Sequence, residues 1–220
     1  MTRAVLFDVD GTLVDTVGFH AEAWSRTCAE FGFDVSVDAV REQIGKGGDL
    51  LLPALIGAAA AAERQEAMEQ RRGQLFTAEY LDRAQGIAGA AGLFRRLRGD
   101  GVRIALASSC KAEELEVYTR AAGVEGLYDA AVTADDVDRS KPFPDIFQAA
   151  LAKVGAEPGQ AVAVGDSVWD AKAAGAAGVP TIGVLTGGFQ PRDLRDAGCV
   201  EVWESVGELL RNYDRSALRR

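Results

Sequence analysis

Two aspartates, Asp8 and Asp10, follow the apolar run 4–7 near the start of the chain. Because side chains alternate along a strand, the two carboxylates leave on the same side and converge just past the strand end. Two such charges about 4 Å apart repel each other by about 4 kcal/mol at an effective dielectric constant of roughly 20. We therefore expect a cation or a proton between them.

Further polar residues lie at or near the ends of later apolar runs: Ser108, Ser109, Lys141, Asp166 and Asp170. Taken singly, each fits a turn, a helix cap or a solvated surface position. Taken together, they suit one site, since acids packed this closely need a hard cation to stay ionised, and oxygen ligands suit Mg²⁺. In such a site one carboxylate could attack phosphorus, a second could transfer protons, and the hydroxyls and the lysine could hold phosphoryl oxygens.

The elements that position these residues alternate regularly from residue 86 onward. Strand-like runs are expected at 102–108, 129–133, 161–166, 180–185 and 199–203, and helix-like segments at 88–99, 111–123, 143–155, 168–177, 191–197 and 204–213. Strands that are apolar on both faces and alternate with helices indicate an α/β fold, a Rossmann-like doubly wound parallel sheet. Its strands end at one edge, where open sheets of this kind bind ligands.

A helical segment interrupts this alternation. Trp24, Cys28 and Phe31 are spaced along one helix face after Asp15 or Thr16 as N-cap, and the Ala-, Glu- and Arg-rich stretch to residue 84 predicts a surface helix. We therefore divide the chain into a catalytic core, 1–15 and 86–220, and an inserted all-helical cap, 16–85. Because the insert leaves directly after a strand end, it is placed to act as a lid.

Composition limits the partners and the compartment. The chain has 220 residues, 48% of them hydrophobic, and a net charge of −9, which excludes the basic surface typical of nucleic-acid binding. The odd, widely spaced Cys28, Cys110 and Cys199 fit reduced thiols in the cytoplasm. We expect neither a leader nor a membrane span, since the chain enters a strand-like run almost at once and no apolar run is long enough to cross a bilayer. We expect a monomer, although an oligomer is left open.

Four segments in order resemble the motifs of one known family. "DVDGTLVD", "ALASS", "SKPFPDIF" and "VGDSVWD" are similar to the four motifs of the haloacid dehalogenase-like superfamily of phosphohydrolases. The helical insert resembles the cap of its phosphoglycolate phosphatases and β-phosphoglucomutases. Dehalogenases of the superfamily lack the second acid and use no magnesium, so Asp10 favours phosphoryl transfer.

The resemblance implies a role for each motif residue. Asp8 would be the nucleophile that becomes an aspartyl-phosphate, and Asp10 would protonate the leaving group and then activate water. Ser108 and Lys141 would hold the phosphoryl group. The implied Mg²⁺ ligands are Asp8, the backbone carbonyl of Asp10, Asp166 and Asp170, the last as a ligand or as a partner of one.

The candidate substrate contacts are Gly11, Thr16, His20, Lys46, Gly47 and Ser109. His20 lies about one helical turn past the catalytic loop, where it would meet substrate or shield the site; its alternative is packing beside Trp24. The turn "GKGG" offers backbone N–H groups and one cation to an anion, and its alternative is a simple connection between helices.

We expect Mg²⁺-dependent hydrolysis of a small phosphorylated metabolite, a sugar phosphate or a phosphoglycolate-like ester. A β-phosphoglucomutase-like phosphosugar mutase is the alternative, but such mutases carry a Glu-Asp pair in the fourth motif, where this chain has Gly165-Asp166. A phospho-aspartate switch that does not turn over is less favoured, because receiver domains are much shorter and lack the helical insert and the second acid.

Overall fold

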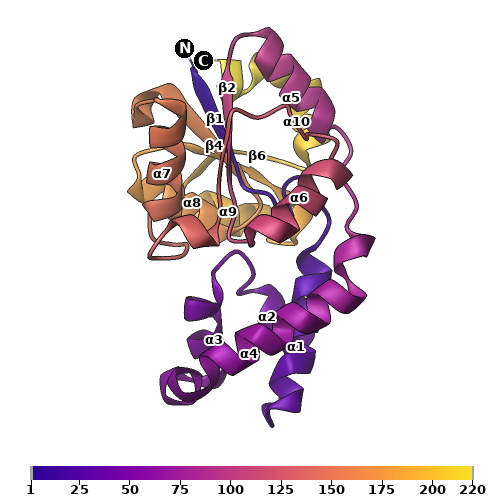
Figure 1. Ribbon diagram of the computed structural model, residues 1–220. Helices are drawn as coiled ribbons and strands as arrows, with labels where there is room; N and C mark the ends of the chain where they lie inside the picture. Colours follow the sequence, from indigo (N-terminus) through magenta and orange to yellow (C-terminus); the bar gives the residue numbers. More distant parts are fainter. Residues whose placement is uncertain (1, 220) are drawn as a thin grey trace.

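The computed structural model describes residues 2–219 and contains a parallel sheet of six strands within them (Figure 1). The strands are β1 Ala4–Phe7, β2 Arg103–Ala107, β3 Ala130–Val132, β4 Ala161–Gly165, β5 Thr181–Val184 and β6 Cys199–Trp203. Every pairing between them is parallel. The predicted strands and the Rossmann-like fold class are confirmed; Met1 and Arg220, the outer ends of the predicted core, lie outside the described residues.

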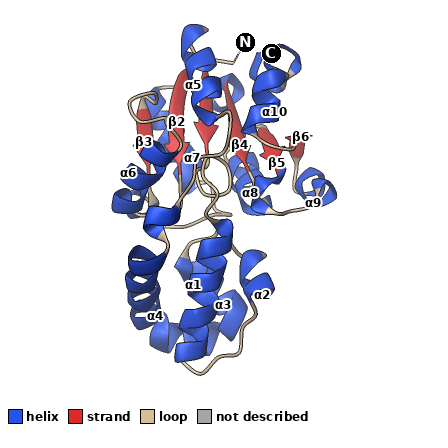
Figure 2. Cartoon of the chain, turned by 90° about the vertical axis from the view of Figure 1, so that its right-hand side faces the viewer, coloured by secondary structure: helices blue, strands red, loops and turns tan. Residues whose placement is uncertain are grey.

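Helices cover both faces of this sheet (Figure 2). They are α5 Ala90–Gly99, α6 Ala112–Ala121, α7 Asp145–Val154, α8 Val168–Ala176, α9 Pro191–Asp196 and α10 Val206–Arg211. Short 3-10 helices occupy Leu81–Arg83, Ala134–Asp136, Pro158–Gln160, Leu185–Gly187, Tyr213–Arg215 and Ala217–Arg219. The long crossovers place these helices against the sheet, which explains why its central strands are apolar on both sides.

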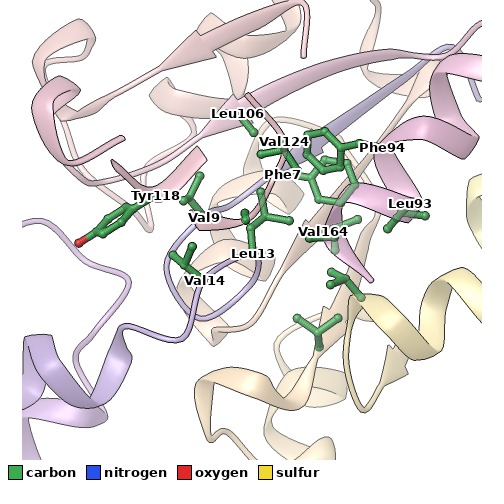
Figure 3. Close-up of a cluster of buried hydrophobic side chains, with 14 of the residues drawn as sticks. Phe7, Val9, Leu13, Val14, Leu93, Phe94, Leu106, Tyr118, Val124 and Val164 are labelled. Atoms are coloured by element: carbon green, nitrogen blue, oxygen red, sulfur yellow. The ribbon is translucent and has the colours of Figure 1, made fainter. Parts of the chain in front are cut away.

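Alternate residues of β1 belong to two separate cores. Val5 and Phe7 pack with α5, α6 and α10, and the Phe7 and Phe94 rings lie 4.7 Å apart (Figure 3). Ala4 and Leu6 face the opposite core, which α7 and α8 cover. Asp8 thus follows a strand that is fully buried on both faces, and this burial holds the start of the loop after β1 in place.

The strand order β3-β2-β1-β4-β5-β6 changes direction at β1. From β1 the chain proceeds outward to β2 and β3 on one side, and later to β4, β5 and β6 on the other. Such a reversal opens a crevice at the carboxyl ends of the central strands, where doubly wound sheets bind ligands. Asp8 and Asp10 lie at this reversal.

The inserted helices lie beyond the carboxyl ends of the strands (Figures 1 and 2). They are α1 Val17–Glu30, α2 Val37–Arg41, α3 Gly48–Ile56 and α4 Ala58–Glu79, and they share a buried cluster that includes Trp24, Leu52 and Met68. The prediction of a plain surface helix for α4 is wrong: Met68 packs inside the insert, whereas Leu75 and Phe76 join the core cluster. The helix therefore connects the two parts of the chain.

Candidate active site

The loop after β1 brings Asp8 and Asp10 to the sheet edge. The N–H of Asp8 still donates to the carbonyl of Val164, 2.9 Å away, so Asp8 is held in line with β4. Gly11 follows with φ +77°, and a Cβ built there would lie 2.4 Å from Asp166 Oδ2. A glycine is required at this position for both reasons, because the backbone is left-handed and passes directly over a carboxylate.

Asp8, Asp166 and Asp170 form a compact acidic cluster. Each is buried, and each offers a carboxylate oxygen within 4.8 Å of the others. The Thr12 hydroxyl lies between two of them, 3.1 Å from Asp8 Oδ2 and 3.0 Å from Asp166 Oδ1. Asp8 and Asp166 follow the adjacent strands β1 and β4, and Asp170 lies in the first turn of α8, so the predicted convergence is a consequence of the strand order.

Lys141 is fully buried against this cluster rather than solvated. Its Nζ lies 2.6 Å from Asp8 Oδ1 and 2.7 Å from Asp170 Oδ1, and it donates to the carbonyl of Ala107 at 2.9 Å. The other oxygen of Asp170 accepts from the N–H and hydroxyl of Ser167 at the start of α8. Asp170 thus caps its helix with one oxygen and pairs with the lysine through the other.

The charges in this cluster shift one another's titration. Burial raises the pKa of Asp8 to about 7, a rise that the charge of Lys141 opposes and those of Asp170 and Asp10 support. Burial and the charges of Asp8 and Asp170 raise the pKa of Asp166 well above its usual range. Lys141 stays protonated, because the charges of Asp170 and Asp8 overcome the effect of burial and raise its pKa. One cation serves three acids here, so all three cannot be ionised together without an excess of negative charge.

The donor set fits the predicted Mg²⁺. It consists of oxygen atoms only, the carboxylates are deeply buried, and the pKa values of Asp8 and Asp166 are raised by that burial first and by the neighbouring acids second. A small divalent cation with a preference for carboxylate oxygen would relieve this repulsion.

Asp10 lies in different surroundings from Asp8. Its Oδ1 accepts from the Thr16 hydroxyl at 2.6 Å and lies 2.9 Å from His20 Nε2. Burial alone would raise the pKa of Asp10, but the charge of His20 and the hydrogen bonds from His20 and Thr16 outweigh it and lower the pKa. The two carboxylates therefore differ: Asp8 belongs to the acidic cluster, and Asp10 is oriented by neighbours from α1.

Thr16 and His20 thus lie beside Asp10. Thr16 is the N-cap of α1, as expected, but its side chain makes no capping hydrogen bond; it is engaged by Asp10 instead. His20 stacks on Phe76 with ring centroids 4.1 Å apart, and its Nε2 lies 3.2 Å from the Tyr118 hydroxyl. Sequence reasoning missed Tyr118, because nothing in the helical pattern of α6 distinguishes a tyrosine that only packs from one whose hydroxyl reaches His20.

The two serines after β2 have different surroundings. Ser108 is fully buried, and its Oγ accepts from the N–H of Cys110 at 3.1 Å. Ser109 lines the cavity above the catalytic loop and donates to the carbonyl of Gly45, 3.4 Å away. Neither serine caps α6, whose N-cap is Lys111.

The turn between α2 and α3 packs on the core. Lys46 Nζ lies 3.9 Å from the centre of the Trp169 ring and donates to Gln43 Oε1 at 2.6 Å. Trp169 Nε1 in turn donates to the carbonyl of Glu42 at 3.3 Å. Gly47 precedes α3 and lines the cavity with Lys46. This turn forms one wall of the site.

A cavity between the inserted helices and the sheet edge is lined by six of the twelve predicted site residues. It is lined by Asp8, Asp10, His20, Trp24, Ile44, Gly45, Lys46, Gly47, Gly48, Leu51, Arg72, Ser109, Cys110 and Glu114. Arg72 and Glu114 were not predicted, because each belongs to a helix whose charges look like an ordinary solvated face. The burial of Glu114 at 5% exposure is visible only in the structure.

Comparison with known families identifies the arrangement. The sequence pattern of the haloacid dehalogenase-like hydrolases matches residues 2–178, more than half of the chain. The chain belongs to this family. The resemblance to this family and the predicted enzyme class, a phosphoric monoester hydrolase, are confirmed.

Two relatives illustrate the range of proteins that contain this fold. The chain is 30% identical over 217 residues to a phosphoglycolate phosphatase of Rhodospirillum rubrum. The alignment covers 95% of this chain and 90% of the relative. It is also 30% identical over 216 residues to Protein SUPPRESSOR OF QUENCHING 1, chloroplastic, of Arabidopsis thaliana; that alignment covers 95% of this chain but only 20% of the longer protein.

Two solved structures share the architecture over their whole length. A hydrolase from Pseudomonas syringae superposes with a TM-score of 0.89 at 28% identity, covering 97% of this chain and 99% of the other. A β-phosphoglucomutase from Clostridium difficile superposes with a TM-score of 0.84 at 20% identity, covering 98% and 96%. The second likeness is one of fold alone.

Proposed function

We propose that this protein is a Mg²⁺-dependent phosphatase that hydrolyses a small phosphorylated metabolite through an aspartyl-phosphate on Asp8. The observation that carries the proposal is the placement of Asp8 and Asp10 side by side on the wall of one cavity, each in its own set of partners. A nucleophile and a proton-transfer group with separate environments are what a two-step phosphoryl transfer needs.

In the first proposed step, an Asp8 oxygen attacks phosphorus and the bond from phosphorus to the leaving oxygen breaks. Asp10 enters this step protonated and gives that oxygen its proton, while His20 Nε2 lies 2.9 Å from Asp10 Oδ1. In the second step, Asp10 accepts a proton from water, whose oxygen attacks the same phosphorus and releases Asp8 and inorganic phosphate. The carboxylate form needed for this second half is the form that Thr16 and His20 stabilise.

The groups around Asp8 hold the nucleophile still. Lys141 binds Oδ1 of Asp8 and the Thr12 hydroxyl binds Oδ2, so the carboxylate keeps one orientation. A Mg²⁺ ion held by Asp8, Asp166, Asp170 and the Asp10 carbonyl would, when bound, supply positive charge to the phosphoryl oxygens. Positioned charge of this kind needs no rearrangement at the moment of reaction.

The inserted helices are proposed to be the specificity cap, with its limits at residues 16 and 85. They provide Trp24, Lys46 and Leu51 to the cavity, whereas the core provides the acids. A closed cap excludes bulk water and lets the phospho-aspartate meet only the intended acceptor.

Hydrolysis is favoured over the mutase reaction by the environment of Gly165. A Cβ at this position would lie 2.5 Å from the Cβ of Asp170. The glutamate that precedes the metal-binding aspartate in the mutase pattern therefore has no room here without movement of α8.

The metabolite is proposed to be the main partner, bound by one copy of the chain in the cytoplasm. Both walls of the cavity come from the same chain, so catalysis needs no second subunit. Cys28, Cys110 and Cys199 are buried and free, which fits a reducing compartment. Among residues 2–219, none of the helices is both long and apolar enough to cross a bilayer.

Phosphate release tests this proposal. We expect the purified protein to hydrolyse p-nitrophenyl phosphate and at least one natural monoester with Mg²⁺, and to stop when EDTA is added or when Asp8→Asn is introduced. The exposed Asp193→Asn is the matched control and should behave as wild type. Activity that survives both EDTA and Asp8→Asn would refute the proposal, and conversion of glucose 1-phosphate to the 6-phosphate without phosphate release would replace it by the mutase.

A further inference from the structure

Arg72 and Glu114 meet at the wall of the cavity, one from the inserted helix α4 and one from the core helix α6. Arg72 Nη1 lies 3.2 Å from Glu114 Oε1, and the two side chains are only 16% and 7% exposed. Both residues line the cavity that contains Asp8 and Asp10. The pair therefore faces the part of a substrate that extends away from the reacting phosphate.

The pair offers both hydrogen-bond donors and an acceptor to that part of the substrate. The Nε of Arg72 is buried without a hydrogen-bond partner, so the donors left for a substrate are those of the terminal guanidinium nitrogens; the guanidinium lies 5.5 Å from the centre of the Trp24 ring. The Glu114 carboxylate retains acceptor capacity beyond its bonds from Arg72 and from the N–H of Lys111. A hydroxyl group, which donates and accepts, can satisfy both members.

The neighbouring charges disfavour a second anion. Because Glu114 already neutralises Arg72, the pair carries no net positive charge. The adjoining hollow, which shares Arg72, Trp24 and Ser109 with this cavity, is lined by Asp49, Glu69, Asp135 and Asp138 against Lys111. An anionic group on the substrate would meet these acids and the carboxylate of Glu114.

Lys46 does not supply the positive charge that a second anionic group of the substrate would need. Its Nζ is turned to the Trp169 ring and is engaged by Gln43. The pKa of Lys46 is lowered by burial and by the charge of Lys172. It belongs to the turn between α2 and α3, which packs on the core through Trp169.

We propose, on the basis of the phosphatase function above, that the substrate is the phosphomonoester of a polyhydroxylated alcohol whose phosphate is its only anionic group. Glu114 and Arg72 together bind the hydroxyls of its carbon chain. A substrate that carries a carboxylate, such as a phosphoglycolate-like ester, is rejected by the charge of Glu114. Like charges placed opposite each other in a binding site discriminate strongly against the wrong partner.

Two matched pairs of esters test this inference: glycerol 3-phosphate against 3-phosphoglycerate, and glucitol 6-phosphate against 6-phosphogluconate. In each pair the members differ chiefly in a carboxylate. We expect wild-type kcat/KM to favour the member without the carboxylate by about tenfold or more in at least one pair. A ratio of one or below in both pairs, or no turnover of either hydroxylated ester, would overturn the inference.

Glu114→Gln should lower this ratio by about tenfold, chiefly by raising kcat/KM for the carboxylated ester, since the amide keeps the shape without the charge. Glu116→Gln, an exposed position on the same helix, is the control and should leave the ratio unchanged. An unchanged ratio in folded Glu114→Gln would also overturn the inference, and the wild-type ratio tests it even if that variant does not fold. If p-nitrophenyl phosphate is hydrolysed but the kcat/KM ratio within both ester pairs is one or below, only this inference is refuted. If no ester is hydrolysed, the proposed function is refuted as well.

Discussion

Asp166→Asn should stabilise the metal-free protein while it abolishes the effect of Mg²⁺. Asparagine has nearly the shape of aspartate and can still accept the Thr12 hydrogen bond, so the main change is one negative charge. Asp166 lies in the cluster with Asp8 and Asp170 but does not pair with Lys141, which keeps its own two partners. The variant therefore removes repulsion without breaking an ion pair.

The size of the effect follows from the cluster geometry. With carboxylate oxygens up to 4.8 Å apart, each repulsion is at least about 3 kcal/mol at an effective dielectric constant of roughly 20. Two neighbours give about 7 kcal/mol. Proton uptake limits how far Asp166 can destabilise the protein, because the carboxyl can take up a proton instead of staying charged. At pH 8, protonating a carboxyl with an ordinary pKa near 3.9 costs about 1.4 kcal/mol per pH unit, or about 6 kcal/mol. Small movements of the side chains reduce both figures. We therefore expect Asp166→Asn to raise the free energy of unfolding by about 3 kcal/mol, or the Tm by roughly 6–12 °C.

The gain should depend on pH with a defined sign. The folded-state pKa of Asp8 is raised to about 7, and that of Asp166 is raised as well. Above pH 7 the wild-type protein must keep Asp8 charged beside the other acids in a poor environment, which lowers its stability. As the pH falls through 7 toward the unfolded-state value near 4, the wild-type protein takes up protons and recovers. The difference between variant and wild type should therefore be largest at pH 8 and small at pH 5.

Thermal unfolding in EDTA at pH 8 and pH 5, followed by addition of Mg²⁺, measures these differences. Wild type should gain stability from Mg²⁺ by about 2.7 kcal/mol at a hundredfold excess over Kd, whereas Asp166→Asn should gain little. Asp193→Asn provides the control for an exposed aspartate. A variant less stable than wild type in EDTA at pH 8 would refute the electrostatic reasoning.

Three further variants test other parts of the structure. Tyr118→Phe removes only the hydroxyl 3.2 Å from His20 Nε2 and should lower kcat several-fold with little change in KM; an unchanged kcat would leave Tyr118 as packing. Gly165→Ala should destabilise the fold by about 1–3 kcal/mol in denaturant unfolding, since its Cβ would lie 2.5 Å from that of Asp170; wild-type stability would contradict this. Met68→Ala, at a fully buried position in the cap cluster, should lower stability by about 2–5 kcal/mol, and a smaller loss would mean that the insert collapses around the cavity.

The positions of the strands and most helices followed from the sequence because they depend on local periodicity. The run 199–203, for example, is strand β6 to the residue. Predicted helix ends were less accurate: the segment expected at 143–155 is helical from Asp145 to Val154. Helix α4 was misjudged because a narrow buried stripe that includes Met68 and Phe76 is hidden among many charged residues.

The sequence by itself determined the order of the motifs, the parallel α/β core and the set of acids that meets at the edge of the sheet. These depend on spacing within single elements and on the handedness of the crossovers, which are local rules. Only the tertiary structure decided which partner each group takes. Lys141 bridges Asp8 and Asp170, and Arg72 meets Glu114, because packing of the sheet and the insert brings together residues that are far apart in the chain. Burial then sets the charge on each group, and no local pattern encodes burial between elements.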